Sequence, residues 1–295
     1  MRILITGGTG FVGMRIVGEI VDAGHEVVSL SRGVHAPGHP YPVTNVKIDL
    51  VRPEGLDDAL RGVDTVVHAA GITREVSGQS FERAHVGSTE NLVAACKDAG
   101  VGKIVHLSAL GARTTAPTAY LTTKWHAEQI IENSGIAYTI FRPSLIFGAG
   151  DRFISHLLTL LRFSPFVPVL GPEQAMVQPV WVGDVATAIV RAVADDSTSG
   201  NTYELGGPAP MSFADLVELL KQSASRPVLS VHLPGFLSRP FVKLGEMLFQ
   251  DPPLTTEQLG ALAMGGTCDP NPAAVTFGLR MRSLEDVLPE YRGQE

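Results

Sequence analysis

A tyrosine and a lysine stand four residues apart in the segment AYLTTKWHAE, at residues 119–128. On a helix this spacing places Tyr120 and Lys124 on one face. Free tyrosine has a pKa of about 10, too high for proton transfer at neutral pH, and a nearby ammonium group lowers it by favouring the phenolate. The two residues are therefore a candidate acid/base pair. The alternative is a solvated helix surface, because this spacing is common by chance.

A serine lies ahead of this pair, at the end of an apolar, β-branched run. Ser108 follows KIVHL, residues 103–107, which has the composition of a strand. In an open α/β sheet, ligands bind beyond the carboxyl ends of the strands. We therefore expect Ser108, Tyr120 and Lys124 to converge. The serine hydroxyl would donate to a substrate oxygen whose charge changes during hydride transfer.

Three glycines follow the first apolar run of the chain. The segment ITGGTGFVG places Gly7, Gly10 and Gly13 between a predicted strand and a predicted helix. One glycine allows a tight turn, one lets backbone amides approach a pyrophosphate, and one lets helix and strand pack closely. This context predicts a dinucleotide site. Its neighbouring contacts are expected at Thr9, Phe11 and Val12.

The end of the second predicted strand bears on the choice of cofactor. The segment SLSRG offers Ser31 and Arg32 where a carboxylate would hold the ribose 2′-hydroxyl of NAD. A hydroxyl and a guanidinium suit a 2′-phosphate instead. We therefore predict NADP, with NAD as the alternative. Arg32 could otherwise stack on the adenine or point into water.

Two further strand ends complete the predicted nucleotide site. Asp49 and Leu50 close the third strand, where the adenine edge would lie. Ala69, Ala70 and Gly71 follow the fourth strand, beside the phosphates. For Asp49, a turn or helix cap is an equally good reading.

Short apolar runs alternate with helical patterns over the first half of the chain. We predict the runs to be strands buried on both faces: RILITGG, EVVSLSR, NVKIDL, DTVVHAAG, KIVHLSALG and AYTIFRPSLIFG. Between them lie helical patterns at residues 12–23, 54–61, 80–98 and 120–133. This alternation predicts right-handed crossovers and an α/β fold with a doubly wound parallel sheet of the Rossmann type.

The alternation is lost after FGAGD at residues 147–151. We expect helices at about 153–162, 213–223, 236–249 and 256–263, with the proline-rich SPFVPVLGP after the first and a strand at NTYELGG. The predicted dinucleotide-binding domain therefore comprises residues 1–149 and about 178–207. A smaller C-terminal substrate-binding lobe would comprise 150–177 and 208–295.

Composition limits the classes of function. The net charge of −7 gives no general attraction to nucleic acid. The cysteines, Cys96 and Cys268, and the scattered histidines have no metal-ligand spacing. No apolar run reaches the roughly 18–20 residues of a membrane span. We place the first strand at Arg2, which leaves no room for a signal peptide, and we therefore expect a cytoplasmic protein. We expect a monomer or a homodimer.

Several motifs, in this order, carry a resemblance to a known family: TGGTGFVG, HAAG, LSALGA, YLTTK, RPSLIFGAGD and QPVWVGDVA. Over about residues 1–207 the chain resembles the short-chain dehydrogenase/reductase superfamily. It is similar to the extended or atypical branch with the NAD-dependent epimerase/dehydratases, and to the group of the nucleotide-binding accessory subunit of respiratory complex I. The resemblance implies a Rossmann fold of about seven strands, a bound dinucleotide and a catalytic Ser108, Tyr120 and Lys124.

The resemblance also assigns other positions. Many relatives carry a proton-relay asparagine before the fifth strand, where this chain has His85 in AHVGSTENL. In relatives the segment after the sixth strand lines the nicotinamide, which implies backbone contacts from Pro143, Ser144 and Leu145; a plain strand-end role is the alternative. The complex I branch includes members that hold NADP without turnover.

The lobe suggests the kind of substrate. Its crevice-facing candidates are mostly apolar, and residues 150–180 contain only two arginines for phosphate binding. The candidates are Phe153, His156, Phe163, Phe166, Met176, Gln178 and Trp181. They favour an apolar carbonyl or alcohol, unless they are ordinary core. The amphipathic stretch at 235–249 could touch a membrane surface, although packing within the lobe or at a subunit interface suits it better.

Three functional hypotheses follow. The first is an NADP-dependent oxidoreductase that moves hydride to or from a small, largely apolar carbonyl or alcohol, with Tyr120 as acid/base. The second is a non-catalytic protein that holds NADP and serves in binding or assembly. The third is a sugar-nucleotide epimerase or dehydratase with a retained NAD.

Overall fold

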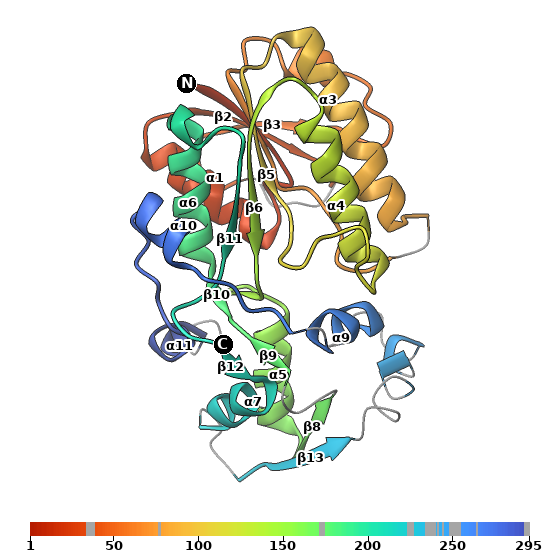
Figure 1. Cartoon of the computed structure of the whole chain (residues 1–295), viewed down its shortest axis with the longest axis vertical. Helices are drawn as coiled ribbons and strands as arrows, with labels where there is room; N and C mark the ends of the chain where they lie inside the picture. Colours follow the sequence, from red (N-terminus) through yellow and green to blue (C-terminus); the bar gives the residue numbers. More distant parts are fainter. Residues whose placement is uncertain are drawn as a thin grey trace. The chain divides into compact units, whose positions relative to one another are not determined.

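Seven parallel strands form the main sheet in the computed structural model of the chain (Figure 1). The structure describes residues 1–33, 39–75, 78–170, 175–222, 227–233, 240, 242–243, 245–247, 255–263 and 265–291. In chain order, the strands of this sheet are β1 (Arg2–Thr6), β2 (Glu26–Ser31), β3 (Thr44–Lys47), β4 (Thr65–His68), β5 (Lys103–Leu107), β6 (Ala137–Pro143) and β11 (Asn201–Leu205).

The strand order is β11-β6-β5-β4-β1-β2-β3, which confirms the predicted doubly wound parallel sheet. The order reverses at β1, because β2 lies on one side of it and β4 on the other. Ligands of such sheets bind beyond the carboxyl ends of the strands at this reversal. The first glycine-rich turn follows β1 and therefore lies at this point.

The strand β3 differs from its prediction. It was expected to be buried on both faces, but Thr44, Asn45 and Lys47 are exposed. The reason is its place at the edge of the sheet, where it pairs only with β2. A polar edge strand that carries a lysine resists pairing with other chains.

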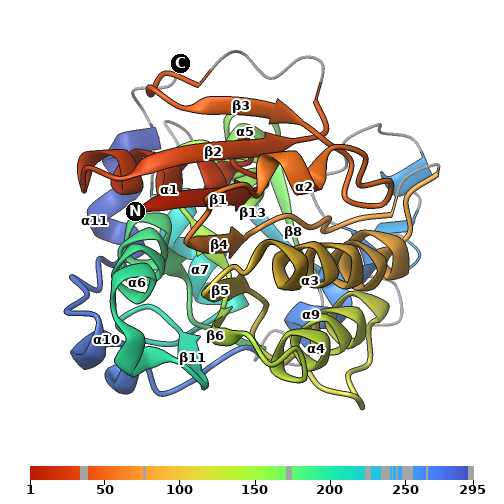
Figure 2. The ribbon, with the colours of Figure 1, turned by 90° about the horizontal axis from the view of Figure 1, so that it is seen from above.

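Helices cover both faces of the sheet (Figure 2). On one face lie α1 (Phe11–Asp22) and α6 (Val182–Ala194). On the other lie α2 (Leu56–Ala59), α4 (Ala119–Glu132) and α3 (Ser88–Ala99), which continues a π-helical turn, η1 (Glu82–Gly87). The apolar core on this second face includes Leu4, Val66, Leu92, Ile104 and Ile131.

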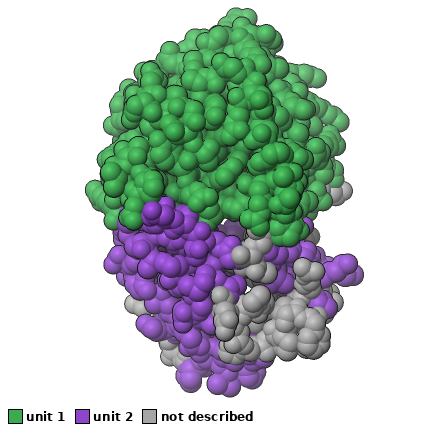
Figure 3. All heavy atoms as spheres, viewed as in Figure 1, with its two compact units in different colours: residues 1–143, 182–205, 271–280 green, residues 144–181, 206–270, 281–295 purple. Residues whose placement is uncertain are grey.

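The chain divides into two compact units (Figure 3). Unit 1 comprises Met1–Pro143, Val182–Leu205 and Asn271–Arg280, and unit 2 comprises Ser144–Trp181, Gly206–Pro270 and Met281–Glu295. The predicted boundaries put all residues after 207 in the lobe, whereas Asn271–Arg280, with helix α10 (Asn271–Thr276), packs within unit 1. The assignment of the second unit to substrate binding stays a prediction.

Short elements make up unit 2. Its helices include α5 (Phe153–Phe163), α7 (Phe213–Lys221), α9 (Thr256–Ala263) and α11 (Leu284–Tyr291). Among its described residues, strands pair as β7 (Ile146–Phe147) with β10 (Val180–Trp181), β9 (Met176–Val177) with β12 (Met211–Ser212), and β8 (Phe166–Leu170) with β13 (Leu229–Leu233). Most of the helix predicted at 236–249 lies outside the described residues.

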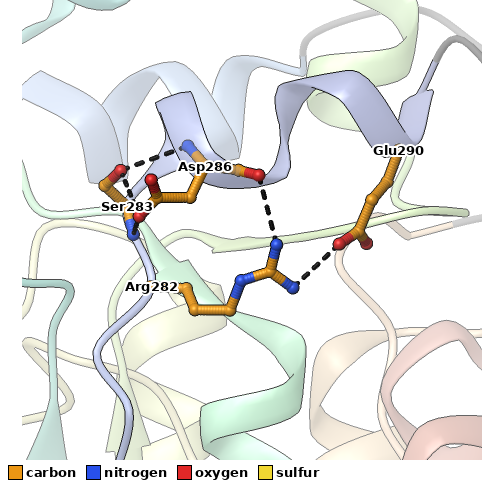
Figure 4. A network of polar contacts seen from close by, with 4 residues as sticks. All are labelled: Arg282, Ser283, Asp286 and Glu290. Atoms are coloured by element: carbon orange, nitrogen blue, oxygen red, sulfur yellow. Dashed lines mark hydrogen bonds and ion pairs between the residues drawn. The ribbon is translucent and has the colours of Figure 1, made fainter.

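Polar contacts fix the start of α11 (Figure 4). The Ser283 hydroxyl accepts a hydrogen bond from the Asp286 amide at 3.2 Å, and the Asp286 carboxylate accepts one from the Ser283 amide at 3.1 Å. This reciprocal pair satisfies amides that the first turn of a helix leaves without partners. The Arg282 guanidinium lies 2.8 Å from the Glu290 carboxylate and stacks over the Trp181 ring at 4.5 Å. The arginine thus ties α11 to β10.

The described residues contain neither a membrane-spanning helix nor a metal-binding cluster. In the part of the chain that the structure describes, no helix is both long and apolar enough to cross a bilayer. Within the same residues, histidine, cysteine and carboxylate side chains form no group that could hold a metal ion.

Candidate functional site

The glycine-rich turn between β1 and α1 excludes side chains at two positions. Gly7 adopts φ of 74°, in the left-handed region that favours glycine. A Cβ on Gly13 would lie 2.1 Å from the Gly7 carbonyl oxygen, closer than any real contact. The Gly10 amide donates to this same carbonyl at 2.9 Å. The turn therefore needs glycine at positions 7 and 13, as the sequence predicts.

The first turn of α1 is suited to an anion. Gly10 precedes the helix, and neither a capping side chain nor an acidic residue occupies its first turn. The amide groups in the first turn of a helix have no partner within the helix, and they lie at the positive end of the helix dipole. Together with the closely packed glycines, they make a cradle that a dinucleotide pyrophosphate would fit.

The residues predicted for the adenosine end occupy two strand ends. Ser31 ends β2 and is half-buried, and Arg32 is exposed. Asp49 is also exposed, and its carboxylate accepts from the Val51 amide at 3.1 Å, so that it caps a turn. The Leu50 side chain lies in the core. Contacts from these residues to adenine or ribose stay predictions.

The residues after β4 connect the glycine turn to the acid/base candidates. The Ala70 amide donates to the Thr6 hydroxyl at 3.1 Å, and a Cβ on Gly7 would lie 2.9 Å from the Ala70 Cα. A Cβ on Gly71 would lie 3.3 Å from both His85 Nε2 and Lys124 Nζ. Glycine at position 71 therefore lets the chain pass close to both side chains.

Ser108 and Lys124 meet at the end of β5. The Lys124 ammonium donates to the Leu107 carbonyl at 2.9 Å, directly before Ser108. The Ser108 hydroxyl is buried and has no hydrogen-bond partner among the described residues. Burial lowers the pKa of Lys124 to about 8, against the opposing attraction of the Glu128 carboxylate. A buried hydroxyl without a partner costs free energy in a native protein unless a ligand or water serves it.

Tyr120 shares the helix α4 with Lys124 but differs from its prediction in one respect. We expected the ammonium to lower the pKa of Tyr120, whereas burial raises this pKa to about 12. The tyrosine ring packs edge-on against the rings of His85 and Phe81, with centroids 5.6 and 5.7 Å away. These rings replace water around the phenol, which disfavours its charged form.

His85, noted in the sequence at the position of an asparagine, is buried beside this group. Its Nδ1 lies 2.9 Å from the Thr123 hydroxyl, and its Nε2 lies 3.2 Å from the Ile72 amide. Burial, and to a lesser extent the charge of Lys124, lowers the pKa of His85 to about 2. The ring is therefore neutral at physiological pH.

Sequence reasoning missed two further buried histidines. His68 ends β4 and His106 lies opposite it in β5, with ring centroids 5.1 Å apart. Their signal in the sequence is a polar residue within an apolar run that is buried on both faces, where polar side chains require partners.

The segment after β6 spans the boundary between the units. The Pro143 carbonyl accepts from the Leu110 amide at 2.8 Å within unit 1. In unit 2 the Ser144 hydroxyl donates to the Gly266 carbonyl at 3.0 Å, and the Leu145 carbonyl accepts from the Val180 amide at 2.9 Å. Their contacts to the nicotinamide stay predictions.

The lobe candidates fall into three groups. Phe153, Gln178 and Trp181 are buried within unit 2, where the Gln178 side chain is held by the Gly207 carbonyl and the Cys268 amide. Phe163, Phe166 and Met176 are exposed, by 73 %, 52 % and 38 %, and His156 is half-buried. Three of the candidates thus have the packing of ordinary core residues.

Known proteins are similar to this chain over most of its length. The model of the NAD dependent epimerase/dehydratase family matches residues 3–206. A mitochondrial protein of Arabidopsis thaliana, NADH dehydrogenase [ubiquinone] 1 alpha subcomplex subunit 9, is 31 % identical over 225 residues, which are 73 % of this chain. The match spans only 56 % of that protein.

A reductase and a solved structure extend the comparison. The 2-alkyl-3-oxoalkanoate reductase of Stenotrophomonas maltophilia is 27 % identical over 253 residues, 77 % of each chain. The structure of MoeE5 in complex with UDP-glucuronic acid and NAD superposes with a TM-score of 0.78 and 21 % identity, covering 100 % of this chain and 99 % of the other. At this identity the structural likeness shows a shared fold.

Proposed function

The chain belongs to the NAD-dependent epimerase/dehydratase family, and from this membership we propose that it is an NADP-dependent oxidoreductase acting on a small, largely apolar carbonyl compound. One observation carries the proposal. The buried Ser108 hydroxyl, without a partner among the described residues, lies directly after the carbonyl that holds the Lys124 ammonium. Ser108 and the ammonium of Lys124 both lie at the end of β5, which pairs with β4, and the residues after β4 pack against the glycine turn.

The protonation states favour reduction of a carbonyl. The bound dinucleotide would supply hydride to the carbonyl carbon. The Ser108 hydroxyl would donate a hydrogen bond to the carbonyl oxygen as it gains negative charge. Because burial holds the pKa of Tyr120 at about 12, the phenol carries its proton at neutral pH and can give it to this oxygen. The Lys124 ammonium, one helical turn away, would stabilise the phenolate that remains.

The cofactor preference rests on the end of β2. Ser31 and the exposed Arg32 suit a 2′-phosphate, and Asp49 caps a turn through the Val51 amide. We therefore propose NADP as the cofactor, although the name of the family gives NAD. The compartment and the oligomeric state stay predictions.

The substrate class draws on the composition and on one relative. The scarcity of arginine at residues 150–180 disfavours a sugar nucleotide, whose phosphates need cationic partners. The reductase relative acts, by its name, on an alkyl-substituted 3-oxo acid. We propose a carbonyl substrate with an apolar chain.

The test is hydride transfer by purified protein. NADPH or NADH would be mixed with alkyl 3-oxo acids, apolar ketones and quinones, and oxidation of the nicotinamide followed by absorbance. We expect turnover with NADPH and a loss of at least about 100-fold in kcat in Tyr120→Phe, the size of effect of general acid catalysis. The matched control is Tyr138→Phe on β6. Unchanged turnover in Tyr120→Phe would refute the assigned role.

The alternative is a protein that holds NADP without turning it over. Two observations favour it: a relative is named as a subunit of NADH dehydrogenase, and the Lys124 ammonium is engaged by the Leu107 carbonyl. Mass spectrometry of the protein as purified tests it. Retained NADP, no exchange with added NADPH and no turnover across the panel would establish the alternative; rapid exchange would reject it.

A further inference from the structure

Threonine and histidine residues alternate along a buried line in unit 1, whose link from Thr89 to His85 ends on the His85 main-chain carbonyl. The line runs from β1 through β4 and α3 to η1 and α4. Its members are Thr6, His68, Thr89, His85 and Thr123. Nothing in the proposed chemistry requires His68, Thr89 or Thr123 to touch a ligand, and each of these side chains is buried.

The donors and acceptors around His68 fix its tautomer. The Thr6 hydroxyl accepts from the Ala70 amide and lies 2.8 Å from His68 Nδ1. On the other side, the Thr89 hydroxyl donates its only hydrogen to the His85 carbonyl at 2.5 Å. Thr89 can therefore only accept from His68 Nε2, at 3.0 Å. His68 then carries its hydrogen on Nε2 and accepts at Nδ1 from Thr6.

The contacts of His85 allow either neutral tautomer. The Thr123 hydroxyl can donate to the carbonyl of Ala119 or Tyr120, at 2.8 and 3.0 Å, and accept from His85 Nδ1 at 2.9 Å. His85 Nε2 lies 3.2 Å from the Ile72 amide, from which it can accept, and 3.0 Å from the Ile72 carbonyl, to which it can donate. Both imidazoles are neutral, since burial lowers the pKa of His68 to about 3 and that of His85 to about 2.

Each end of the line reaches a part of the proposed site. At one end, Thr6 holds the Ala70 amide, and the Ala70 backbone packs against Gly7 so closely that a Cβ there would lie 2.9 Å away. At the other end, Thr123 binds the Tyr120 carbonyl in the first turn of α4. Consecutive hydrogen bonds in a buried network strengthen one another, and the covalent frame of His85 joins the bonds from Ala70 to Thr89 with the contact between the His85 ring and Thr123.

We propose that His68 is a positioning residue: in its Nε2-protonated form it joins Thr6 to Thr89 and so couples the glycine turn to the helix that carries Tyr120 and Lys124. The inference rests on the proposed function, which makes the glycine turn the dinucleotide site and α4 the helix of the acid/base pair. It predicts that a break in the middle of the line, at a side chain too buried to meet a ligand, weakens dinucleotide binding.

The test is Thr89→Val, which replaces the hydroxyl by a methyl group of similar size. We expect the Kd for NADPH, measured by fluorescence titration, to rise about tenfold, as for the loss of one buried hydrogen bond. Thr89→Ser keeps the hydroxyl and should restore wild-type binding. The matched control is Thr139→Val, which removes an equally buried hydroxyl that donates to the Thr198 carbonyl elsewhere in unit 1. Equal weakening in both valine variants, or in neither, would overturn the coupling.

A second readout needs neither cofactor nor turnover. Nitrogen NMR of the full chain distinguishes protonated from unprotonated imidazole nitrogens, with His68→Gln and His85→Gln providing the assignments. Hydrogen on Nε2 of His68 supports the proposal, and hydrogen on Nδ1 of His68 overturns it. Wild-type protein that binds NADPH without turnover would refute the oxidoreductase alone, whereas wild-type protein that binds neither NADPH nor NADH would refute the coupling as well.

Discussion

Tyr120 and Lys124 respond to the same burial in opposite directions. Loss of water raises the pKa of the phenol to about 12 and lowers the pKa of the ammonium to about 8. In both cases the neutral form gains, because burial penalises whichever form is charged. At neutral pH the pair is therefore a protonated phenol beside an ammonium, which is the combination that carbonyl reduction needs.

This pair gives the reaction a defined pH dependence. We expect kcat for carbonyl reduction to fall as the pH rises through about 8, because Lys124 loses its proton there while Tyr120 keeps its own up to about 12. The measurement is a pH–rate profile at saturating substrate and NADPH. Lys124→Arg is the control, since guanidinium does not titrate in this range. A decline of the same shape in Lys124→Arg would assign the titration to another group.

The sequence supplies candidates for this site but not their surroundings. Motif order and strand ends sufficed to choose Ser108, Tyr120 and Lys124, whose roles stay proposals. The raised pKa of Tyr120 was not predictable, because it depends on the rings of Phe81 and His85, which pack on it from another element. Hydrogen-bond partners such as those of His68 come from several elements, so spacing along the chain does not reveal them.

At the scale of elements, an ion pair holds α4 against β6. The Arg142 guanidinium makes two hydrogen bonds to the Glu128 carboxylate, at 2.9 and 2.5 Å. The Glu128 side chain is fully buried, and the Arg142 side chain is 24 % exposed. This pair fixes the helix that carries Tyr120 and Lys124.

Removing the arginine should therefore destabilise the protein strongly. In Arg142→Met the Glu128 carboxylate stays buried without its partner, and we expect the free energy of unfolding to fall by about 3 kcal/mol. Urea denaturation at pH 7 measures it. Arg61→Met, which breaks an exposed pair with Asp58, should change it by less than about 1 kcal/mol. Similar losses in both variants would show that the buried pair contributes no more to the free energy of unfolding than the exposed pair does.

Strand prediction succeeded where apolar runs were continuous and failed where strand order mattered. The runs of β1, β4 and β5 are buried on both faces, as interior strands of a parallel sheet require. The polar faces of β3 follow from its edge position, which no single run specifies. The pairing of β8 with β13 was missed because Pro168 argues against a strand and the partner lies far along the chain.

At the scale of the whole molecule, unit 1 is assembled from three stretches of chain. The last of them, Asn271–Arg280, was predicted to belong to the lobe. It packs in unit 1 through Phe277, which is buried and meets the rings of Phe141 and Tyr203 with centroids 5.2 and 4.8 Å away. Contacts this distant in sequence leave no local pattern, so only the folded chain reveals them.

This packing makes the nucleotide-binding unit dependent on a segment near the end of the sequence. We expect Phe277→Ala to lower the free energy of unfolding by about 3–5 kcal/mol, because it leaves a cavity beside two aromatic rings. Val275→Ala, in the same segment but 82 % exposed, should change it by no more than about 0.5 kcal/mol. Urea unfolding gives both values, and hydrogen exchange should show the loss of protection in β6 and β11, where Phe141 and Tyr203 lie. If Phe277→Ala opened only residues 271–280 and left those strands protected, the segment would be an appendage of unit 1 rather than part of its core.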